Sequence, residues 1–197
     1  TYHFFQPEMD AQMQARHNLE LDLRKALVAG EFELYYQPLV DLESNSVSGF
    51  EALVRWNHPE RGVIAPDDFI SVAEEIGLIV PIGDWVLKQA CRDAAKWPGN
   101  LTVAVNLSAV QFRNPTLALS VVGALGASGL PASRLELEIT ETVLLQDSRA
   151  VLDVLHQIRE LGVRISMDDF GTGYSSLSYL RSFPFDKIKI DRYFIPE

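Results

Sequence analysis

Apolar and polar residues alternate with a period of two in three short segments of the chain: Leu135–Thr140, residues 163–168 and residues 187–191. Successive side chains of a strand point to opposite faces, so each predicted strand has one apolar and one polar face. Strands of a doubly wound sheet, covered on both faces, would instead be almost continuously apolar. The apolar face suits packing against helices, and the polar face must line a wet or ionic space. The alternation therefore favours a barrel over an open α/β sheet.

The rest of the chain shows helical and strand periods in turn. Predicted helices cover residues 8–29, 66–76, 80–97, 117–127, 148–161 and 175–181, and predicted strands cover residues 32–42, 47–56, 101–108, 135–140, 163–170 and 187–194. Only residues 43–46 separate the first two strands, which predicts an antiparallel hairpin. The later alternation of strand and helix predicts parallel pairing. The fold class is α/β, as most of a (β/α)-barrel.

Charge and composition limit the classes of function. The 197 residues carry a formal net charge of −10, which argues against binding a nucleic-acid polymer or an anionic membrane by electrostatics alone. A phosphate ligand remains compatible if a metal stands between the two anions. The one cysteine, Cys91, lies in a helical pattern and is interpreted as a small buried residue. The four histidines show no metal-site spacing, and surface positions are expected for all of them, including His58.

Acidic residues gather where the predicted strands end. Glu138 and Asp168 lie near the ends of two strands, and Asp169 follows directly. Asn106 has a similar position, and Glu51 lies in the hairpin. Residues at the C-terminal ends of barrel strands build active sites. Clustered carboxylates repel one another unless cations neutralise them, and carboxylate and amide oxygens suit Mg²⁺ or Mn²⁺. Lys189 adds a positive charge at the same end.

Each of these residues also has an ordinary structural interpretation. A single strand glutamate is usually solvated or ion-paired, Asp168-Asp169 can cap a helix, and Asn106 can belong to a turn. The glycine- and serine-rich stretch at residues 169–176 is either a lid over a ligand or a plain strand-to-helix connection. Arg55 either clamps a phosphate or lies at the rim. Only the joint pattern favours a metal site.

Six ordered motifs resemble the EAL domain, a bacterial cyclic-di-GMP phosphodiesterase module. They are Glu51-Ala52-Leu53-Val54-Arg55, Tyr36-Gln37-Pro38, Asn106-Leu107-Ser108, Glu138-Ile139-Thr140-Glu141, the stretch at residues 168–176 and Lys189-Ile190-Asp191. The resemblance implies a (β/α)8 TIM-like barrel variant with an antiparallel first hairpin. It also implies hydrolysis of one phosphodiester bond of cyclic-di-GMP to linear pGpG.

The resemblance assigns a role to individual residues. Metal ligands would be Glu51, Asn106, Glu138, Asp168 and Asp169, in a site for two Mg²⁺ or Mn²⁺ ions. Lys189 would orient or help deprotonate the attacking water, and Glu141 would hold the loop at residues 169–176. Gln37 would meet a guanine, and Leu53 and Arg55 would contact the ligand near its phosphate.

The chain departs from the family pattern in its length, because about 250 residues are typical of such a barrel. The sequence predicts that residues 19–197 are an EAL domain lacking its C-terminal strand–helix units. Residues 1–18 are expected to be a linker from an upstream GGDEF-like domain. A non-catalytic cyclic-di-GMP receptor and an inactive truncated fragment are the alternatives. A cytoplasmic location and a possible homodimer are further expectations, with no membrane contact by this segment.

Overall fold

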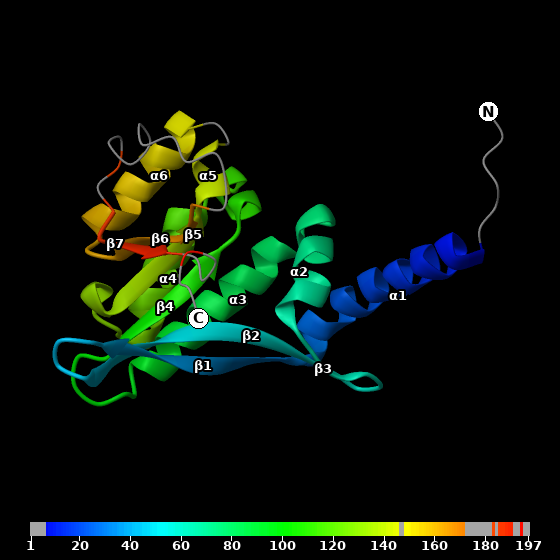
Figure 1. The fold of residues 1–197 in the computed structure, drawn as a ribbon, viewed down its shortest axis with the longest axis horizontal. Coiled ribbons are helices and arrows are strands. Elements are labelled where there is room, and N and C mark those ends of the chain that lie inside the picture. Colours follow the sequence, from blue (N-terminus) through cyan, green and yellow to red (C-terminus); the bar gives the residue numbers. More distant parts are fainter. Residues whose placement is uncertain (1–6, 146–147, 172–182, 184, 191–193, 195–197) are drawn as a thin grey trace.

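The computed structural model describes residues 7–145, 148–171, 183, 185–190 and 194. A seven-stranded sheet is the centre of the fold (Figure 1). Its strands are β1 (Phe32–Asp41), β2 (Ser46–His58), β3 (Gly62–Ile64), β4 (Thr102–Leu107), β5 (Leu135–Thr140), β6 (Arg164–Phe170) and β7 (Lys187–Ile190). The helices are α1 (Pro7–Ala29), α2 (Pro66–Glu75), α3 (Ile79–Ala94), α4 (Leu117–Ser128), α5 (Glu141–Leu145) and α6 (Ser148–Glu160), with 3₁₀ turns η1 (Ala109–Arg113) and η2 (Ala132–Arg134).

The strand order is that of a barrel with an antiparallel first pair. The path runs β1-β2-β4-β5-β6-β7, and β3 pairs with β2 outside it. The β1–β2 pair is antiparallel, whereas every pair from β2–β4 to β6–β7 is parallel. This confirms the predicted hairpin and α/β alternation. Within the described residues the sheet is open, with β1 and β7 as its edges.

Some elements differ from the sequence prediction. The short strand β3 was not predicted, because three residues are too few for a detectable period. The predicted helix at residues 175–181 lies outside the described residues, as does most of the predicted last strand beyond Ile190. The expected domain boundary at residues 18 and 19 falls inside α1, and the division into two domains stays a prediction.

The outer face of the sheet packs against the helices to form the hydrophobic core. Trp56, Phe69 and Phe32 meet through their rings where β1 and β2 cover α2, and all three are buried. Cys91 on α3 is fully buried, and burial raises the pKa of its thiol to about 12, which agrees with a structural role. The other face carries the polar residues of the strands, as their alternation predicts.

A hydrogen bond between Tyr36 and Asp93 joins β1 to α3 at the edge of this core. The Tyr36 hydroxyl donates to Asp93 Oδ2 at 2.8 Å, and its ring packs edge-on against Trp97. Burial, followed by the bond to Asp93, raises the pKa of Tyr36 above its ordinary value of about 10. The contribution of this hydrogen bond to the free energy of unfolding is therefore fully present below about pH 10, and it is lost as the pH rises further.

We expect Tyr36→Phe to lower the free energy of unfolding by about 1 kcal/mol at neutral pH. The difference in the free energy of unfolding between the variant and the unsubstituted protein should become smaller above about pH 10. Tyrosine can ionise in the unfolded state at that pH, whereas phenylalanine cannot. Urea unfolding at about pH 8 and about pH 11 measures both effects. Tyr35→Phe is the control, and a difference independent of pH would contradict the assignment.

Close contact between β2 and β4 requires a glycine at position 49. A Cβ added to Gly49 would lie 2.5 Å from the backbone oxygen of Thr102, its partner on β4. Because the clash would be with backbone, it can be relieved only if β2 and β4 move apart. We expect Gly49→Ala to destabilise the fold by about 1–3 kcal/mol.

Gly126 in α4 offers the matched control for this substitution. No heavy atom lies within 4 Å of its added Cβ, so Gly126→Ala should stabilise the helix by about 0.5–1 kcal/mol. Thermal unfolding of both variants tests the pair of signs, and equal shifts would contradict the close-contact explanation.

The second half of α1 packs on the domain through Leu23 and Ala26, which are fully buried. His58 supports this contact, and its expected surface position is wrong: its side chain is buried. The Nδ1 atom accepts hydrogen bonds from the backbone of Glu60 and Arg61, and Nε2 lies 3.2 Å from Asp22 of α1. A histidine beside Pro59 suggested a loop, whereas β2 extends through His58. Among the described residues, no helix is long and apolar enough to cross a membrane.

Candidate metal centre

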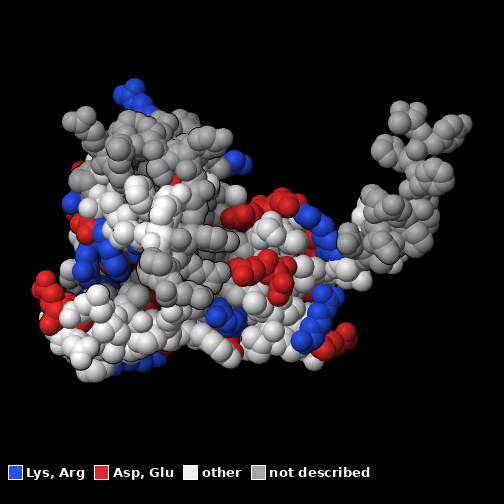
Figure 2. Space-filling view, viewed as in Figure 1, with Lys and Arg blue, Asp and Glu red and all other residues white. Residues whose placement is uncertain are grey.

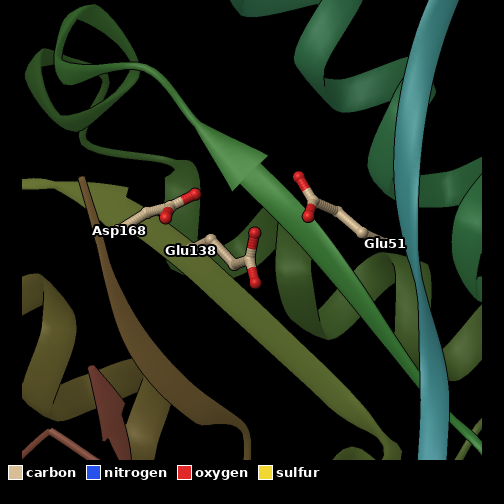
Figure 3. A group of neighbouring side chains, drawn as sticks. All are labelled: Glu51, Glu138 and Asp168. Carbon is tan, nitrogen blue, oxygen red and sulfur yellow. The ribbon is translucent and has the colours of Figure 1, made fainter. Parts of the chain in front are cut away.

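Three carboxylates from three strands converge on the inner face of the sheet (Figure 3). Glu51 comes from β2, Glu138 from β5 and Asp168 from β6, and one oxygen of each lies within 4.8 Å of those of the others. The parallel register also places Asn106 on β4 opposite Glu138 on β5. Asn106 Nδ2 donates to Glu51 Oε1 at 2.8 Å. The structure therefore brings together four of the five predicted metal-ligand side chains.

Lys189 of β7 lies among the three carboxylates. Its ammonium nitrogen is 3.0 Å from Glu51 Oε2, 2.8 Å from Glu138 Oε2 and 2.9 Å from Asp168 Oδ2. Burial alone would lower the pKa of Lys189, but the bonds to Glu138 and Asp168 dominate and raise it above its ordinary value. The lysine thus stays charged. One positive charge does not balance the charge that three carboxylates can carry, so the centre retains an affinity for a further cation.

Glu138 has the least favourable surroundings for a negative charge. Its side chain is fully buried, and its Oε1 atom has no hydrogen-bond partner among the described residues. Burial, followed by the charges of Glu51 and Asp168, raises the pKa of Glu138 to about 7 despite Lys189. A buried carboxylate oxygen without a partner is costly, and a cation would satisfy it. This oxygen is the observation that fits the donor set to a metal.

A bulge in β6 explains how the adjacent residues Asp168 and Asp169 can both lie at the C-terminal end of the strands, which we call the mouth of the sheet. The β6–β7 register shifts between Met167 and Phe170, and Asp169 has a φ of 56°. Without the irregularity, strand parity would direct the two side chains to opposite faces. The Asp169 amide donates to Asp168 Oδ1 at 2.9 Å, and Asp169 lines the cleft beside Asn106. Bulges that redirect side chains are common next to active sites.

A cleft of about 610 Å³ opens beside the centre, between the strand ends and α2. Leu53, Asn106, Thr140 and Asp169 are among its lining residues. The α2 helix contributes acidic side chains as well, and Figure 2 shows acidic residues gathered over that helix. An anionic ligand would be repelled by such walls unless cations are bound there.

Two of these wall residues, Asp67 and Glu74, were not predicted from the sequence. Both line the cleft, and Glu74 Oε1 accepts a hydrogen bond from the Ser108 hydroxyl at 2.5 Å. Their spacing of seven residues places them on one face of a helix. That signal was available, but any amphipathic surface helix shows the same one.

The three predicted ligand-contacting residues, Gln37, Leu53 and Arg55, lie on the β1–β2 hairpin. Gln37 of β1 is the partner of Glu51 in the β1–β2 register, and Leu53 lines the cleft. Arg55 Nη1 donates to the Val54 carbonyl at 2.8 Å, and its guanidinium carbon lies 5.3 Å from the Tyr35 ring centre. These positions are compatible with the predicted contacts, which stay predictions.

Glu141 is buried at the first position of α5. The loop that it was predicted to hold includes residues 172–176, which lie outside the described residues. Its role in holding that loop therefore stays a prediction.

Comparison with known proteins identifies the family. The model of the EAL domain matches residues 20–197. This chain belongs to the EAL domain family. The structure of the MucR phosphodiesterase in complex with c-di-GMP superposes with a TM-score of 0.86 at 47% sequence identity, over 90% of this chain and 74% of that one.

Curated relatives are considerably longer than the matched region. The y4lL protein of Sinorhizobium fredii is 57% identical over 193 residues, which are 98% of this chain and 23% of that protein. MucR of Pseudomonas aeruginosa, a bifunctional diguanylate cyclase/cyclic di-GMP phosphodiesterase, is 46% identical over 200 residues, covering 100% of this chain and 29% of MucR. The EAL chain thus spans about a quarter of the length of these relatives.

Proposed function

We propose that this EAL domain hydrolyses one phosphodiester bond of cyclic-di-GMP to linear pGpG, using Mg²⁺ or Mn²⁺. The main support is the cluster of Glu51, Glu138 and Asp168 around Lys189. Within it, one buried oxygen of Glu138 lacks a hydrogen-bond partner among the described residues. The names of MucR and of its complex support the choice of substrate.

The proposed cation site uses five side chains. Glu51, Asn106, Glu138 and Asp168 would hold one ion, and Asp168 and Asp169 a second. Oxygen donors of this kind suit Mg²⁺ and Mn²⁺, and turning the Asn106 amide would present its oxygen. Bound cations would supply Lewis acidity, which neutralises charge on the phosphate and makes a nearby water more acidic.

The chain's own residues would orient the reactants. The three hydrogen atoms of the Lys189 ammonium point to three carboxylates at 2.8–3.0 Å. Where bound cations take up those carboxylate oxygens, a hydrogen atom of Lys189 would become available to hold a water molecule against the phosphorus. That water would lose a proton and add to phosphorus as the bond to one ribose 3′-oxygen breaks, and the leaving oxygen would take up a proton to become a hydroxyl group. Gln37 would select guanine, and Leu53 and Arg55 would position the phosphate side of the ligand.

A receptor without catalysis is the second candidate, supported by the fact that one match is an EAL domain named only as bound to c-di-GMP. The presence of all five predicted ligands together with Lys189 favours the enzyme, since binding alone does not need them. An upstream GGDEF-like domain is a further proposal, based on the bifunctional name of MucR.

Incubation of the intact protein with cyclic-di-GMP and Mg²⁺ or Mn²⁺ tests this function. We expect pGpG to form in chromatography, and a chelator to stop its formation. Calorimetry with cyclic-di-GMP runs in parallel. Binding without product would contradict the enzyme and support the receptor, and neither binding nor product would contradict both.

A further inference from the structure

Two Glu–Lys ion pairs lie one above the other on the inner face of the sheet. Lys189 Nζ is 2.8 Å from Glu138 Oε2, and Lys187 Nζ is 3.0 Å from Glu136 Oε1. The glutamates are two residues apart on β5 and the lysines two residues apart on β7, so all four share one strand face. The Glu136–Lys187 pair, here called the lower pair, repeats the Glu138–Lys189 pair two residues nearer the N-terminal ends of both strands. It lies outside the cleft, whose lining includes neither Glu136 nor Lys187.

Both pairs reach across β6, which separates β5 from β7 in the sheet. The inner residue of β6 at this level is Ser166, in register with both Glu138 and Lys187. Ser166 is fully buried, and its small side chain leaves room for the long ones to cross. The pairs therefore tie β5 to β7 directly, in addition to the backbone ladders through β6.

The lower pair fixes β7 where its backbone pairing is about to become irregular. Lys187 and Ile188 pair regularly with Ser166 and Met167, and the register then shifts at the Asp168–Asp169 bulge. Lys189 stands opposite that bulge, so the ladder constrains it less than it constrains Lys187. Glu136 is buried, and an ionised carboxylate in that position needs the ion pair with Lys187. The ion pair therefore holds the start of β7 in place.

We propose that Glu136 and Lys187 are positioning residues that hold β7 so that the Lys189 ammonium lies among Glu51, Glu138 and Asp168. The proposal rests on the hydrolysis proposed above, in which Lys189 orients the water. Neither residue touches the ligand. They would affect hydrolysis only by fixing the position of the Lys189 side chain, two residues farther along β7.

Lys187→Met in the intact protein is the first test. We expect kcat for cyclic-di-GMP hydrolysis to fall about ten- to a hundredfold, because small displacements of a catalytic group have effects of that size. KM should change less than about twofold, since the ligand contacts remain. Lys187→Arg, which keeps the charge, should retain activity within about threefold. Lys88→Met, which removes the lysine of the Asp84 pair on α3, is the matched control and should match the unsubstituted protein.

A double-mutant cycle with Lys189→Met separates positioning from a general structural role. If Lys187 acts through Lys189, Lys187→Met should lower kcat no further in the Lys189→Met protein. Additive losses, or an unchanged kcat in Lys187→Met, would overturn the positioning role while leaving the hydrolysis proposal intact. Glu136→Gln, which keeps the side-chain shape, provides a second cycle if Lys187→Met does not fold. Absence of turnover in the unsubstituted protein would overturn both proposals.

Discussion

Glu138→Gln is expected to reduce cyclic-di-GMP hydrolysis by about a thousandfold. Substitutions of residues that only orient metal ligands cost about 10–100-fold, and removing the charge of a direct ligand should cost more. The variant keeps the shape of the side chain, so the buried site is not emptied. It also removes the carboxylate whose pKa burial and its neighbours raise to about 7. Initial rates of pGpG formation at saturating Mn²⁺ measure the effect.

Glu43→Gln is the matched control for Glu138→Gln. Glu43 is an exposed glutamate in the β1–β2 turn, far along the hairpin from the inner cluster, so its loss should leave the rate unchanged. Equal rates in Glu138→Gln and the unsubstituted protein would contradict the assignment of Glu138 as a metal ligand.

Lys189→Met should lower turnover by about a hundredfold or more while leaving cation binding intact or tighter. The ammonium lies within 3.0 Å of three carboxylates, so it repels any cation that approaches the same oxygens. Its removal weakens the orientation of water but increases the negative charge of the centre. Loss of a metal ligand would lower both quantities together. Mn²⁺ titrations alongside initial rates show which pattern holds, and weaker Mn²⁺ binding would contradict the catalytic role.

The strand parity of the sequence was the most informative predictor of the fold. The alternation in β5, β6 and β7 correctly assigned Glu138, Asp168 and Lys189 to one face. Successive side chains point to opposite faces of a strand even where both faces are covered. The same parity explains the inward position of Glu136, which is buried, but its partner Lys187 lies on a strand 51 residues away. Pairing across such a distance depends on strand order, and the pattern within one segment does not contain that information.

Other features could not be predicted because they break a local rule. Asp168 and Asp169 are successive residues, and only the bulge with its positive φ at Asp169 directs both to the mouth. His58 looked like a loop residue beside Pro59, yet α1 covers it through Asp22. Both depend on contacts with distant segments, which override the preferences of the neighbouring sequence.

The proposed hydrolysis depends on cation binding by the carboxylate cluster, which an equilibrium Mn²⁺ titration followed by electron paramagnetic resonance measures. Free Mn²⁺ gives the signal, so binding is measured without any turnover. We expect the intact protein to deplete free Mn²⁺ and the Glu138→Gln variant to bind Mn²⁺ more than about tenfold more weakly. Indistinguishable titration curves for the two proteins would contradict this expectation.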